Sequence, residues 1–338
     1  MIVREDSMKI LLTGPFGNVG ESTLSELLKR GYKVRCFDKK TRNTKKVHKI
    51  MSKKGKFETI WGDIRNKSDV EKIVQDVDYV IHLCAIIPPE ADEDSNYANE
   101  VNAGGMQNLV NAAEKLEKKP RIIFTSSLAI YGSKMHLPPP RYVTDEIEPL
   151  PHDLYAFQKW EMEKILRASS LEWMILRLTA VPSLRMPMKV PSLMFEVPYD
   201  QRIEFIHTWD AGLACVNALE AFENHKIMHL AGGEKCRMTA GEYITRLLKS
   251  FGVGPIPREC FHEPEHEKDW FHTDWLYTDD SQEILQYQRY TLEDFALEFE
   301  NRIKIRRNLI SLVSPLAKLF LILRSPYYSA NKKKEKEN

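Results

Sequence analysis

The sequence predicts an α/β fold in which a doubly wound parallel sheet carries a small, interleaved C-terminal lobe. Short apolar runs with the length of strands alternate with amphipathic runs of helical period through the first half of the chain. The first apolar run, residues 10–12, leads directly into Gly14, Gly17 and Gly20. After residue 180, prolines interrupt the pattern, and methionine and leucine become frequent. Alternating strands and helices require crossover connections, which give a parallel sheet covered by helices on both faces.

The composition is that of an ordinary globular protein of 338 residues, long enough for one large α/β domain or two smaller ones. The net charge of +1 gives no reason to expect a nucleic-acid partner. The five cysteines are odd in number and form no C-x-x-C pair, which favours the reduced thiols of a cytoplasmic protein over disulfides or structural zinc. We expect no signal peptide and no membrane-spanning helix, because charges interrupt the first residues and no apolar run is long enough.

Each expected element follows from its local pattern. The apolar runs before residue 180 predict strands at residues 10–12, 32–37, 57–61, 79–84, 122–125 and 173–178. Amphipathic patterns between them predict helices at residues 98–118 and 153–168. The elements expected after the proline-rich stretch are a helix at 210–222, a strand at 227–230, a helix at 240–251 and a loop at 255–280.

The three glycines predict a site for a dinucleotide. Gly14 permits a tight turn after the first strand, Gly17 lets a pyrophosphate approach the backbone, and Gly20 lets the helix pack close to the strand. Because this loop follows a strand and opens a helix, it has the context that the motif requires. The predicted regions are an NAD(P)-binding Rossmann domain at 8–180, completed by 207–232, a substrate lobe at 181–206 and 240–300, and a basic apolar tail at 301–338.

Asp38 ends the second expected strand and bears on the choice of cofactor. Its carboxylate is suited to accept hydrogen bonds from both adenosine ribose hydroxyls and would repel a 2′-phosphate, which favours NAD. Lys39, Lys40 and Arg42 follow and leave NADP open, although a solvated helix start is the simpler explanation for them. Asp63, after the third strand, suits either a contact with the adenine edge or an N-cap of the next helix.

A second pattern, Tyr155 followed by Lys159, adds chemistry to the predicted binding site. On a helix these two positions share a face, so the phenol and the ammonium point the same way. An ammonium and an oxidised nicotinamide both favour the phenolate, and so lower the pKa of a tyrosine from about 10 toward a useful range. Ser127, at the end of the fifth strand, is placed to hydrogen-bond a substrate oxygen, while Ser126 is expected to cap the following turn.

These patterns occur together in the order typical of a known family. The chain resembles the extended branch of the short-chain dehydrogenase/reductase superfamily, which contains the NAD-dependent epimerases and dehydratases. The resemblance covers about residues 8–300. The matching motifs are T-G-x-x-G-x-x-G at residues 13–20, H-L-C-A at 82–85, N-x-x-G at 102–105, S-x-x-x-Y-G at 127–132, Y-x-x-x-K at 155–159, L-R at 176–177 and F-I-H-x-x-D at 205–210.

The resemblance implies an NAD(P)-dependent oxidoreductase of the epimerase/dehydratase type, with NAD as the cofactor and NADP left open. It implies that Tyr155 is the acid/base, that Lys159 lowers its pKa and holds the nicotinamide ribose, and that Ser127 orients the reacting oxygen. The expected cofactor contacts are Gly14, Phe16, Gly17, Asn18, Val19, Asp38, Asp63, Ile64, Ala85, Asn102, Tyr155 and Lys159. We also expect a small-molecule substrate, a homodimer and no metal. A non-catalytic NAD(P)-binding scaffold or sensor is the alternative, although such a protein needs no Ser-Tyr-Lys set.

One position departs from the family pattern and affects the expected substrate. Nucleotide-sugar enzymes of the family carry an asparagine for the substrate diphosphate after the sixth strand, where this chain has Ala180. The stretch that follows is apolar, so an apolar or lipid-like alcohol or ketone gains weight over a nucleotide sugar. Packing of the lobe's own core explains the apolar residues more simply. These residues are Met186, Met188, Leu193, Met194 and Phe195.

Two further regions carry charge without a clear motif. The acidic, histidine-bearing stretch within residues 255–280 has no spacing diagnostic of a metal, so a solvated loop is expected. Residues 301–338 carry ten lysines and arginines against two glutamates, and residues 309–323 among them are strongly apolar. This tail suits either a peripheral contact with an anionic membrane surface or docking on its own domain or on a dimer partner.

Overall fold

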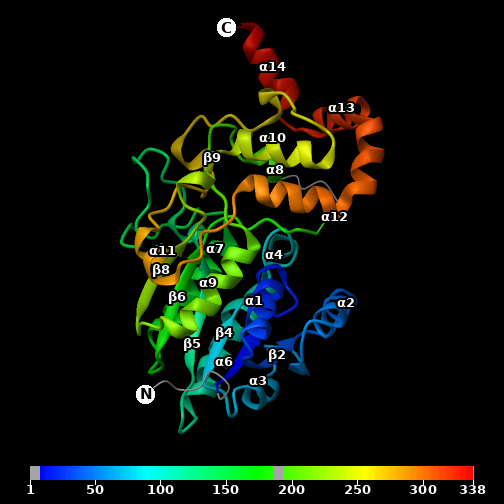
Figure 1. Cartoon of the computed structure of the whole chain (residues 1–338). Coiled ribbons are helices and arrows are strands. Elements are labelled where there is room, and N and C mark those ends of the chain that lie inside the picture. Colours follow the sequence, from blue (N-terminus) through cyan, green and yellow to red (C-terminus); the bar gives the residue numbers. More distant parts are fainter. Residues whose placement is uncertain (1–7, 186–192, 338) are drawn as a thin grey trace.

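The computed structural model describes residues 8–185 and 193–337. Within them, seven strands form one parallel sheet in the order β3-β2-β1-β4-β5-β6-β8 (Figure 1). The strands are β1 (Lys9–Thr13), β2 (Lys33–Asp38), β3 (Glu58–Trp61), β4 (Tyr79–His82), β5 (Arg121–Ser127), β6 (Trp173–Leu178) and β8 (Lys226–Leu230). The predicted fold class, a Rossmann-type doubly wound parallel sheet, is confirmed.

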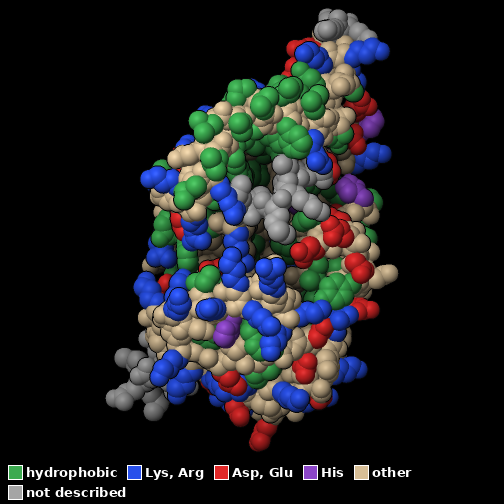
Figure 2. Space-filling model, turned by 90° about the vertical axis from the view of Figure 1, so that its right-hand side faces the viewer, with side chains coloured by type: hydrophobic (Ala, Val, Ile, Leu, Met, Phe, Trp, Pro, Cys, Tyr) green, Lys and Arg blue, Asp and Glu red, His purple; other side chains and the backbone are tan. Residues whose placement is uncertain are grey.

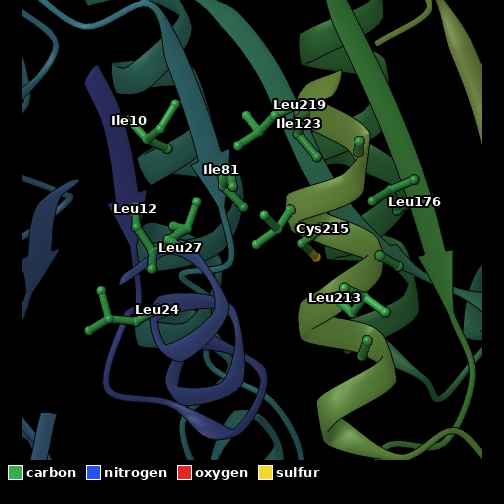
Figure 3. Packing of buried hydrophobic residues seen from close by; sticks show 14 of the residues in the cluster. Ile10, Leu12, Leu24, Leu27, Ile81, Ile123, Leu176, Leu213, Cys215 and Leu219 are labelled. Atoms are coloured by element: carbon green, nitrogen blue, oxygen red, sulfur yellow. The ribbon is translucent and has the colours of Figure 1, made fainter. Parts of the chain in front are cut away.

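Helices cover both faces of this sheet, because successive residues of each strand point to opposite sides. On β1, Ile10 and Leu12 face α1 (Asn18–Lys29) and α9 (Thr208–Glu220), in the cluster that Figure 3 shows. Leu11 belongs to the opposite cluster. The helices on that second face are α3 (Lys67–Ile73), α6 (Gly105–Glu114) and α7 (Leu154–Arg167).

The strand order changes direction between β1 and β4. From β1 the chain moves outward to β2 and β3, and from β4 it moves outward the other way to β5, β6 and β8. The connections that leave the carboxyl ends of β1 and β4 therefore diverge. Such a switch point opens the crevice in which α/β proteins bind their ligands.

The helix expected at residues 98–118 is interrupted, so the prediction of one continuous helix is wrong. The structure has α5 (Ser95–Asn99), a π-helical turn at Glu100–Gly104 and α6 in succession. Asn102 lies in the wide turn and is fully buried. Its amide bonds to the loop after β4 and to α7, and these contacts accompany the departure from regular α-helix.

The lobe contains a two-stranded antiparallel sheet and the last long helices of the chain, and it lies above the parallel sheet in Figure 1. The remaining strands and helices are α2 (Arg42–Met51), α4 (Glu90–Glu93), α8 (Leu193–Glu196), β7 (Arg202–Glu204), β9 (Arg237–Thr239), α10 (Ala240–Phe251), α11 (Asp279–Leu285), α12 (Leu292–Leu312), α13 (Ser314–Arg324) and α14 (Tyr328–Glu337). The boundary expected at residue 300 falls inside α12, so the tail continues a lobe helix. Of the helices described, none has the length and apolar character needed to cross a membrane.

Two apolar clusters form the core of the lobe. Leu184 packs in the first with the aromatic side chains of α12, and Phe195 is buried in the second. Met194 packs against that second cluster, whereas Leu193 is exposed. Lobe packing, rather than a substrate surface, therefore accounts for Met194 and Phe195. Met186 and Met188 lie outside the described residues.

Buried ion pairs join the lobe to the sheet domain. Asp274 is 3% exposed, with Arg202 Nε 2.6 Å and Arg141 Nε 3.2 Å from its carboxylate oxygens. The backbone of Arg141 also accepts from Tyr277 N (2.8 Å) and donates to the Trp275 carbonyl oxygen (2.7 Å). Residues 274–277, at the end of the loop expected at 255–280, are thus tied to the segment that leads from β5 to α7.

Candidate functional site

The predicted site residues gather where the strands end. Thr13, the last residue of β1, pairs with Phe37 of β2 and with His82 of β4. Asp38 ends β2, and Ser127 ends β5. Because the strands are parallel, these positions share one edge of the sheet, at the switch point. The strand-end residues predicted for the site therefore lie along one edge of the sheet.

The glycine loop between β1 and α1 has the form of an anion site. Gly14 has a φ of +69°, which residues with a side chain rarely adopt, and a Cβ on Gly20 would lie 2.0 Å from the Gly14 carbonyl oxygen. Gly17 is exposed, and a Cβ there would meet only that same oxygen, at 3.4 Å. Across residues 8–185 and 193–337 no side chain caps α1 at Gly17, which leaves N–H groups of its first turn available to an anion. These features fit the pyrophosphate of NAD.

The Asp38 carboxylate faces the same loop. Its Oδ2 accepts a hydrogen bond from Phe16 N (3.2 Å), and its Oδ1 accepts one from Lys39 N (2.8 Å). Burial raises the pKa of Asp38, and the two backbone hydrogen bonds lower it. Burial has the larger effect, and the pKa is about 6. The group is therefore charged at neutral pH, and each oxygen has further lone pairs for a hydroxyl. This geometry fits the expected contact with the adenosine ribose.

Asp63 follows β3 and lies among cations. Its Oδ2 is 2.8 Å from Arg65 Nη2 and 3.8 Å from Lys39 Nζ, and the hydrogen bond from Arg65 lowers the pKa of Asp63. The N-cap of α3 is Asn66, whose side chain accepts from Ser68 N. The N-cap alternative for Asp63 is therefore wrong, and its contact with adenine stays a prediction.

Several predicted cofactor residues have side chains that pack within the fold. Phe16 is buried against the rings of His48 and Trp61, at 5.5 and 5.4 Å between ring centres, and its backbone N–H serves Asp38. Val19 packs against the core of the sheet, Ile64 is buried, and Ala85 is partly exposed. The side chains around the start of α2 are exposed, as expected if these cations belong to a solvated helix start. They are Lys39, Lys40 and Arg42.

Two asparagines hold the loops around the crevice. Asn18 Nδ2 donates to the carbonyl oxygens of residues 181 and 182, at 3.0 and 3.3 Å, and so joins the glycine loop to the start of the lobe. Asn102 Oδ1 accepts from Ile86 N (2.8 Å), while its Nδ2 donates to Ile86 O (2.9 Å) and Gln158 Oε1 (2.7 Å). Asn102 therefore fixes the loop after β4 against α7.

Ser127 and Tyr155 lie near each other at the start of α7, where the Ser127 hydroxyl lowers the pKa of Tyr155 and both residues are partly exposed. Ser127 Oγ also accepts from Ala129 N (3.2 Å) and caps the short turn Leu128–Tyr131. The predicted cap, Ser126, is therefore wrong. Its hydroxyl is buried, and the described residues offer it no hydrogen-bond partner. The alternation along β5 turns the two neighbouring serines to opposite sides.

Lys159 lies one turn along α7 from Tyr155 and is 4% exposed. Its Nζ donates to the Thr125 carbonyl oxygen (2.8 Å) and lies 5.9 Å from the centre of the Tyr155 ring. Burial lowers the pKa of Lys159 to about 8, so the ammonium is the main form at neutral pH. Burial raises the pKa of Tyr155, the Asp153 carboxylate raises it further, and the hydrogen bond with Ser127 lowers it. Without a bound cofactor, burial and Asp153 outweigh Ser127, and the pKa of Tyr155 lies above its usual value.

An acid–histidine pair beside Tyr155 was missed in the sequence. Asp153 caps α7, since its Oδ1 accepts from Ala156 N (2.9 Å), and its Oδ2 lies 3.0 Å from His272 Nδ1. Burial would raise the pKa of Asp153, but the hydrogen bond and charge of His272 outweigh it and hold the pKa below its usual value. An aspartate before an apolar helical pattern is a recognisable N-cap signal. His272 has no such signal, because it comes from a loop far later in the chain.

A buried polar network supports the turn after β5. Arg177 of β6 binds both carboxylate oxygens of Glu163 on α7, at 2.9 and 2.7 Å, and donates to Tyr131 Oη at 2.5 Å. That phenol lies 2.8 Å from His229 Nε2 on β8. Buried polar groups need such partners, and the network links three elements to the turn that begins at Ser127.

No group of three His, Cys, Asp or Glu side chains in the described part of the chain is arranged to hold a metal ion. In the acidic stretch, Glu265 pairs with Lys334 (2.7 Å), and Glu267 pairs with His136 (2.9 Å). A cavity of about 780 Å³ lies between this stretch and α14. Its lining includes no residue predicted for the cofactor or catalysis.

Comparison with known proteins places these features in a family. The profile of the NAD dependent epimerase/dehydratase family matches residues 10–231. CDP-paratose 2-epimerase of Salmonella typhi is 33% identical over 130 residues, 37% of this chain and 38% of that protein. The 3-beta-hydroxysteroid dehydrogenase of Mycolicibacterium neoaurum is 29% identical over 191 residues, 54% of this chain and 48% of that protein. The chain thus spans about half the length, or less, of these curated relatives.

Solved structures share the fold over most of the chain. UDP-glucuronic acid 4-epimerase from Bacillus cereus, in complex with UDP-4-deoxy-4-fluoro-glucuronic acid and NAD, has a TM-score of 0.73, covers 88% of this chain and 99% of its own, and is 22% identical. UDP-glucose 4-epimerase from Bifidobacterium longum, in complex with NAD⁺ and UDP, has a TM-score of 0.71, covers 89% and 99%, and is 19% identical. Since the family profile covers the greater part of the sequence, the chain belongs to the NAD dependent epimerase/dehydratase family of enzymes, whose cofactor is NAD.

Proposed function

We propose that this protein is an NAD-dependent oxidoreductase of the epimerase/dehydratase type in which Tyr155 is the acid/base. One observation carries the proposal. The Ser127 hydroxyl lies near enough to the Tyr155 phenol to lower its pKa, and the Lys159 ammonium is buried one helical turn away, at the strand ends that also carry the glycine loop. Family membership supports this reading of the three side chains.

The chain's own groups have distinct tasks in this proposal. NAD, held by the glycine loop and Asp38, would supply the hydride acceptor for the carbon that carries the substrate hydroxyl, and NADH the hydride for the reverse reaction. Ser127 Oγ holds the substrate oxygen, and the Tyr155 phenolate takes the hydroxyl proton as the carbonyl forms. Reduction runs the same transfer backward, with Tyr155 giving the proton to the oxygen. Lys159 favours the phenolate from 5.9 Å and has two ammonium hydrogens beyond the one on Thr125 for the nicotinamide ribose.

The substrate has two candidate classes. Nucleotide sugars are supported by the names of several relatives, among them CDP-paratose 2-epimerase. An apolar alcohol or ketone is favoured by Ala180, which brings no side-chain donor or acceptor to the end of β6, and whose carbonyl oxygen already accepts from Ile206 N (3.1 Å). The relatives named 3-beta-hydroxysteroid dehydrogenase and D-erythronate dehydrogenase support a redox substrate without a nucleotide.

The decisive variant is Tyr155→Phe, which removes the acid/base and keeps the ring. Nucleotide sugars would be assayed for epimers and dehydrated products, and alcohols and ketones for net change in NADH. We expect turnover to fall about 10²- to 10⁴-fold while the Kd for NAD, measured by calorimetry, stays within about twofold.

Tyr142→Phe is the matched control, because Tyr142 is an exposed phenol stacked on Tyr277 and its loss should leave turnover unchanged. Wild-type turnover in Tyr155→Phe would overturn the assignment. An enzyme that binds NAD and turns over neither substrate class would favour the scaffold or sensor alternative. A homodimer and a cytoplasmic location are part of the proposal.

A further inference from the structure

The end of α12 and the whole of α13 present an apolar surface to solvent. On α12 the exposed residues recur at the spacing of one helix face, and the same spacing continues on α13. We call this surface the α12–α13 face; it comprises Ile305, Leu309, Leu312, Val313, Leu316, Leu319, Phe320 and Leu323, which are 48% to 80% exposed. Figure 2 shows hydrophobic side chains gathered on the upper part of the molecule, where these helices lie.

The other sides of these helices are anchored in the lobe. Phe295, Phe299 and Ile303 of α12 are buried in its first apolar cluster, and Leu321 of α13 is buried in the second. Just after α13, Ser325 Oγ donates to the Cys260 carbonyl oxygen (2.6 Å). The α12–α13 face therefore belongs to helices that pack on the lobe, and its exposure does not come from an unpacked chain end. Monomeric proteins seldom leave a contiguous apolar surface of this kind without a partner.

The segment that carries the face is basic, although Arg302, Arg307 and Lys334 within it pair with glutamates. Residues 301–338 carry a net charge of +8, from ten lysines and arginines and two glutamates, and the first 300 residues carry 1 − 8 = −7. Lys304 and Arg324 are exposed beside the apolar side chains, and the Arg324 guanidinium lies 5.7 Å from the centre of the Phe320 ring. The partner of this face must accordingly be apolar at its centre and anionic around it.

We propose that the α12–α13 face binds the surface of an anionic lipid bilayer. Its side chains enter the boundary between headgroups and acyl chains, while the surrounding lysines and arginines pair with lipid phosphates and carboxylates. A second copy of the chain fits this face poorly, because a two-fold interface would bring the same basic segment against itself. The described helices are also unsuited to crossing the bilayer, which leaves binding at its surface. This inference goes beyond the proposed function and does not depend on it.

The test is sedimentation of the full chain with vesicles of phosphatidylcholine alone and of phosphatidylcholine with phosphatidylserine. Wild-type protein should bind the anionic vesicles at least about tenfold more tightly at low salt, and lose most of that preference when added salt screens the charges. Equal binding to both vesicles, or binding to neither, would overturn the proposal.

Paired variants separate the apolar and the charged contributions. Leu309→Ser with Leu316→Ser should weaken vesicle binding at least about tenfold, and Lys304→Gln with Arg324→Gln should remove the salt dependence. The matched controls change exposed residues of the sheet domain, Ile50→Ser with Leu137→Ser and Lys45→Gln with Lys49→Gln, and should bind like wild type.

Since the altered side chains are exposed, circular dichroism and the thermal midpoint should match wild type in every variant. Sedimentation velocity without lipid tests the alternative that the α12–α13 face binds a second copy of the chain. A dimer that becomes a monomer in the Leu309→Ser and Leu316→Ser variant, with no vesicle binding by wild type, would make the face an interface between copies and overturn the membrane proposal.

Discussion

Asp38 lies where β2 ends, with one carboxylate oxygen turned to the backbone of the glycine loop and the other to the Lys39 N–H. Burial raises its pKa to about 6, well above the usual value of a carboxyl group. The ionised group accepts hydrogen bonds from hydroxyls on both oxygens, whereas protonation converts one oxygen to a donor. A small drop in pH below neutrality therefore changes what this residue offers a ribose.

We predict that affinity for NAD falls as the pH is lowered through about 6, by about tenfold or more for loss of a hydrogen bond to a charged group. In Asp38→Asn the Kd should already be weak at pH 7.5 and nearly flat down to pH 5. Calorimetric titration of NAD at several pH values measures both. An equally steep pH dependence in the variant would contradict the assignment.

Folding stability separates this effect from acid unfolding. A carboxyl whose pKa is raised in the folded state stabilises the fold below its unfolded pKa, near 3.9, and loses that contribution as the pH rises through about 6. For Asp38, acid therefore weakens cofactor binding without weakening the fold. The thermal midpoint of the protein without NAD should show no loss from this residue between pH 7 and 5.

Side-chain roles could be predicted where a local pattern determines them. The position of Asp38 at a strand end and of Ser127 at a crevice both follow from the alternation of the sequence, and the structure has them there. Which of Ser126 and Ser127 caps the turn depends on which side of β5 each side chain takes, which local sequence leaves open. The pairing of Asp153 with His272 depends on tertiary folding and had no local signal.

At the scale of elements, two glycines set how closely α1 approaches its neighbours. Gly20 brings α1 against the turn that leaves β1, and Gly212 brings α9 against α1. A Cβ on Gly212 would lie 2.7 Å from the backbone of Ser22 and Thr23, where nothing flexible gives way. Ser22 Oγ confirms the close approach, since it donates to the Thr208 carbonyl oxygen at 2.7 Å.

We predict that Gly212→Ala lowers the free energy of unfolding by about 1–3 kcal/mol, because the two helix backbones must separate to admit one methyl group. Gly104→Ala is the matched control. Its added Cβ would lie 3.8 Å from the nearest neighbour, so it should be neutral or stabilise by about 0.5–1 kcal/mol. Denaturant titration of both variants tests this, and equal stability of Gly212→Ala and wild type would contradict it.

Long helices were easier to predict than their interruptions. The period of residues 98–118 is helical throughout, and nothing in it marks the π-helical turn at Asn102, whose partners lie on the loop after β4 and on α7. The apolar pattern of residues 309–323 predicted a surface for a membrane or for docking. The structure adds a break between α12 and α13 and shows which side of each helix the lobe covers.

For the whole molecule, the alternation of strands and helices predicted the sheet, and the change after residue 180 predicted a lobe. The packing of the lobe against the sheet domain could not be predicted. It depends on ion pairs of Asp274 with Arg141 and Arg202, which come from distant parts of the chain. All three side chains are largely buried, so the Asp274 carboxylate compensates Arg202 and, together with Asp145, Arg141.

We predict that Asp274→Asn destabilises the protein by about 3–5 kcal/mol, because it removes the buried carboxylate that Arg202 and Arg141 share and leaves Arg141 with Asp145 as its ion-pair partner. Asp200→Asn is the control, since Asp200 and its partner Arg258 are both about half exposed; it should cost less than about 1 kcal/mol. Chemical denaturation followed by tryptophan fluorescence measures both. The idea fails if the two variants lose the same stability.

Asn18 gives the molecule a thermodynamic link between its two halves. One side-chain amide, at the first residue of α1, holds two carbonyl groups at the start of the lobe. A ligand that orders the glycine loop therefore also favours one placement of residues 181 and 182, and a ligand that orders those residues favours the same loop. Linkage makes the two effects equal in size. The factor by which a bound substrate raises the affinity for the cofactor therefore equals the factor by which the cofactor raises the affinity for the substrate.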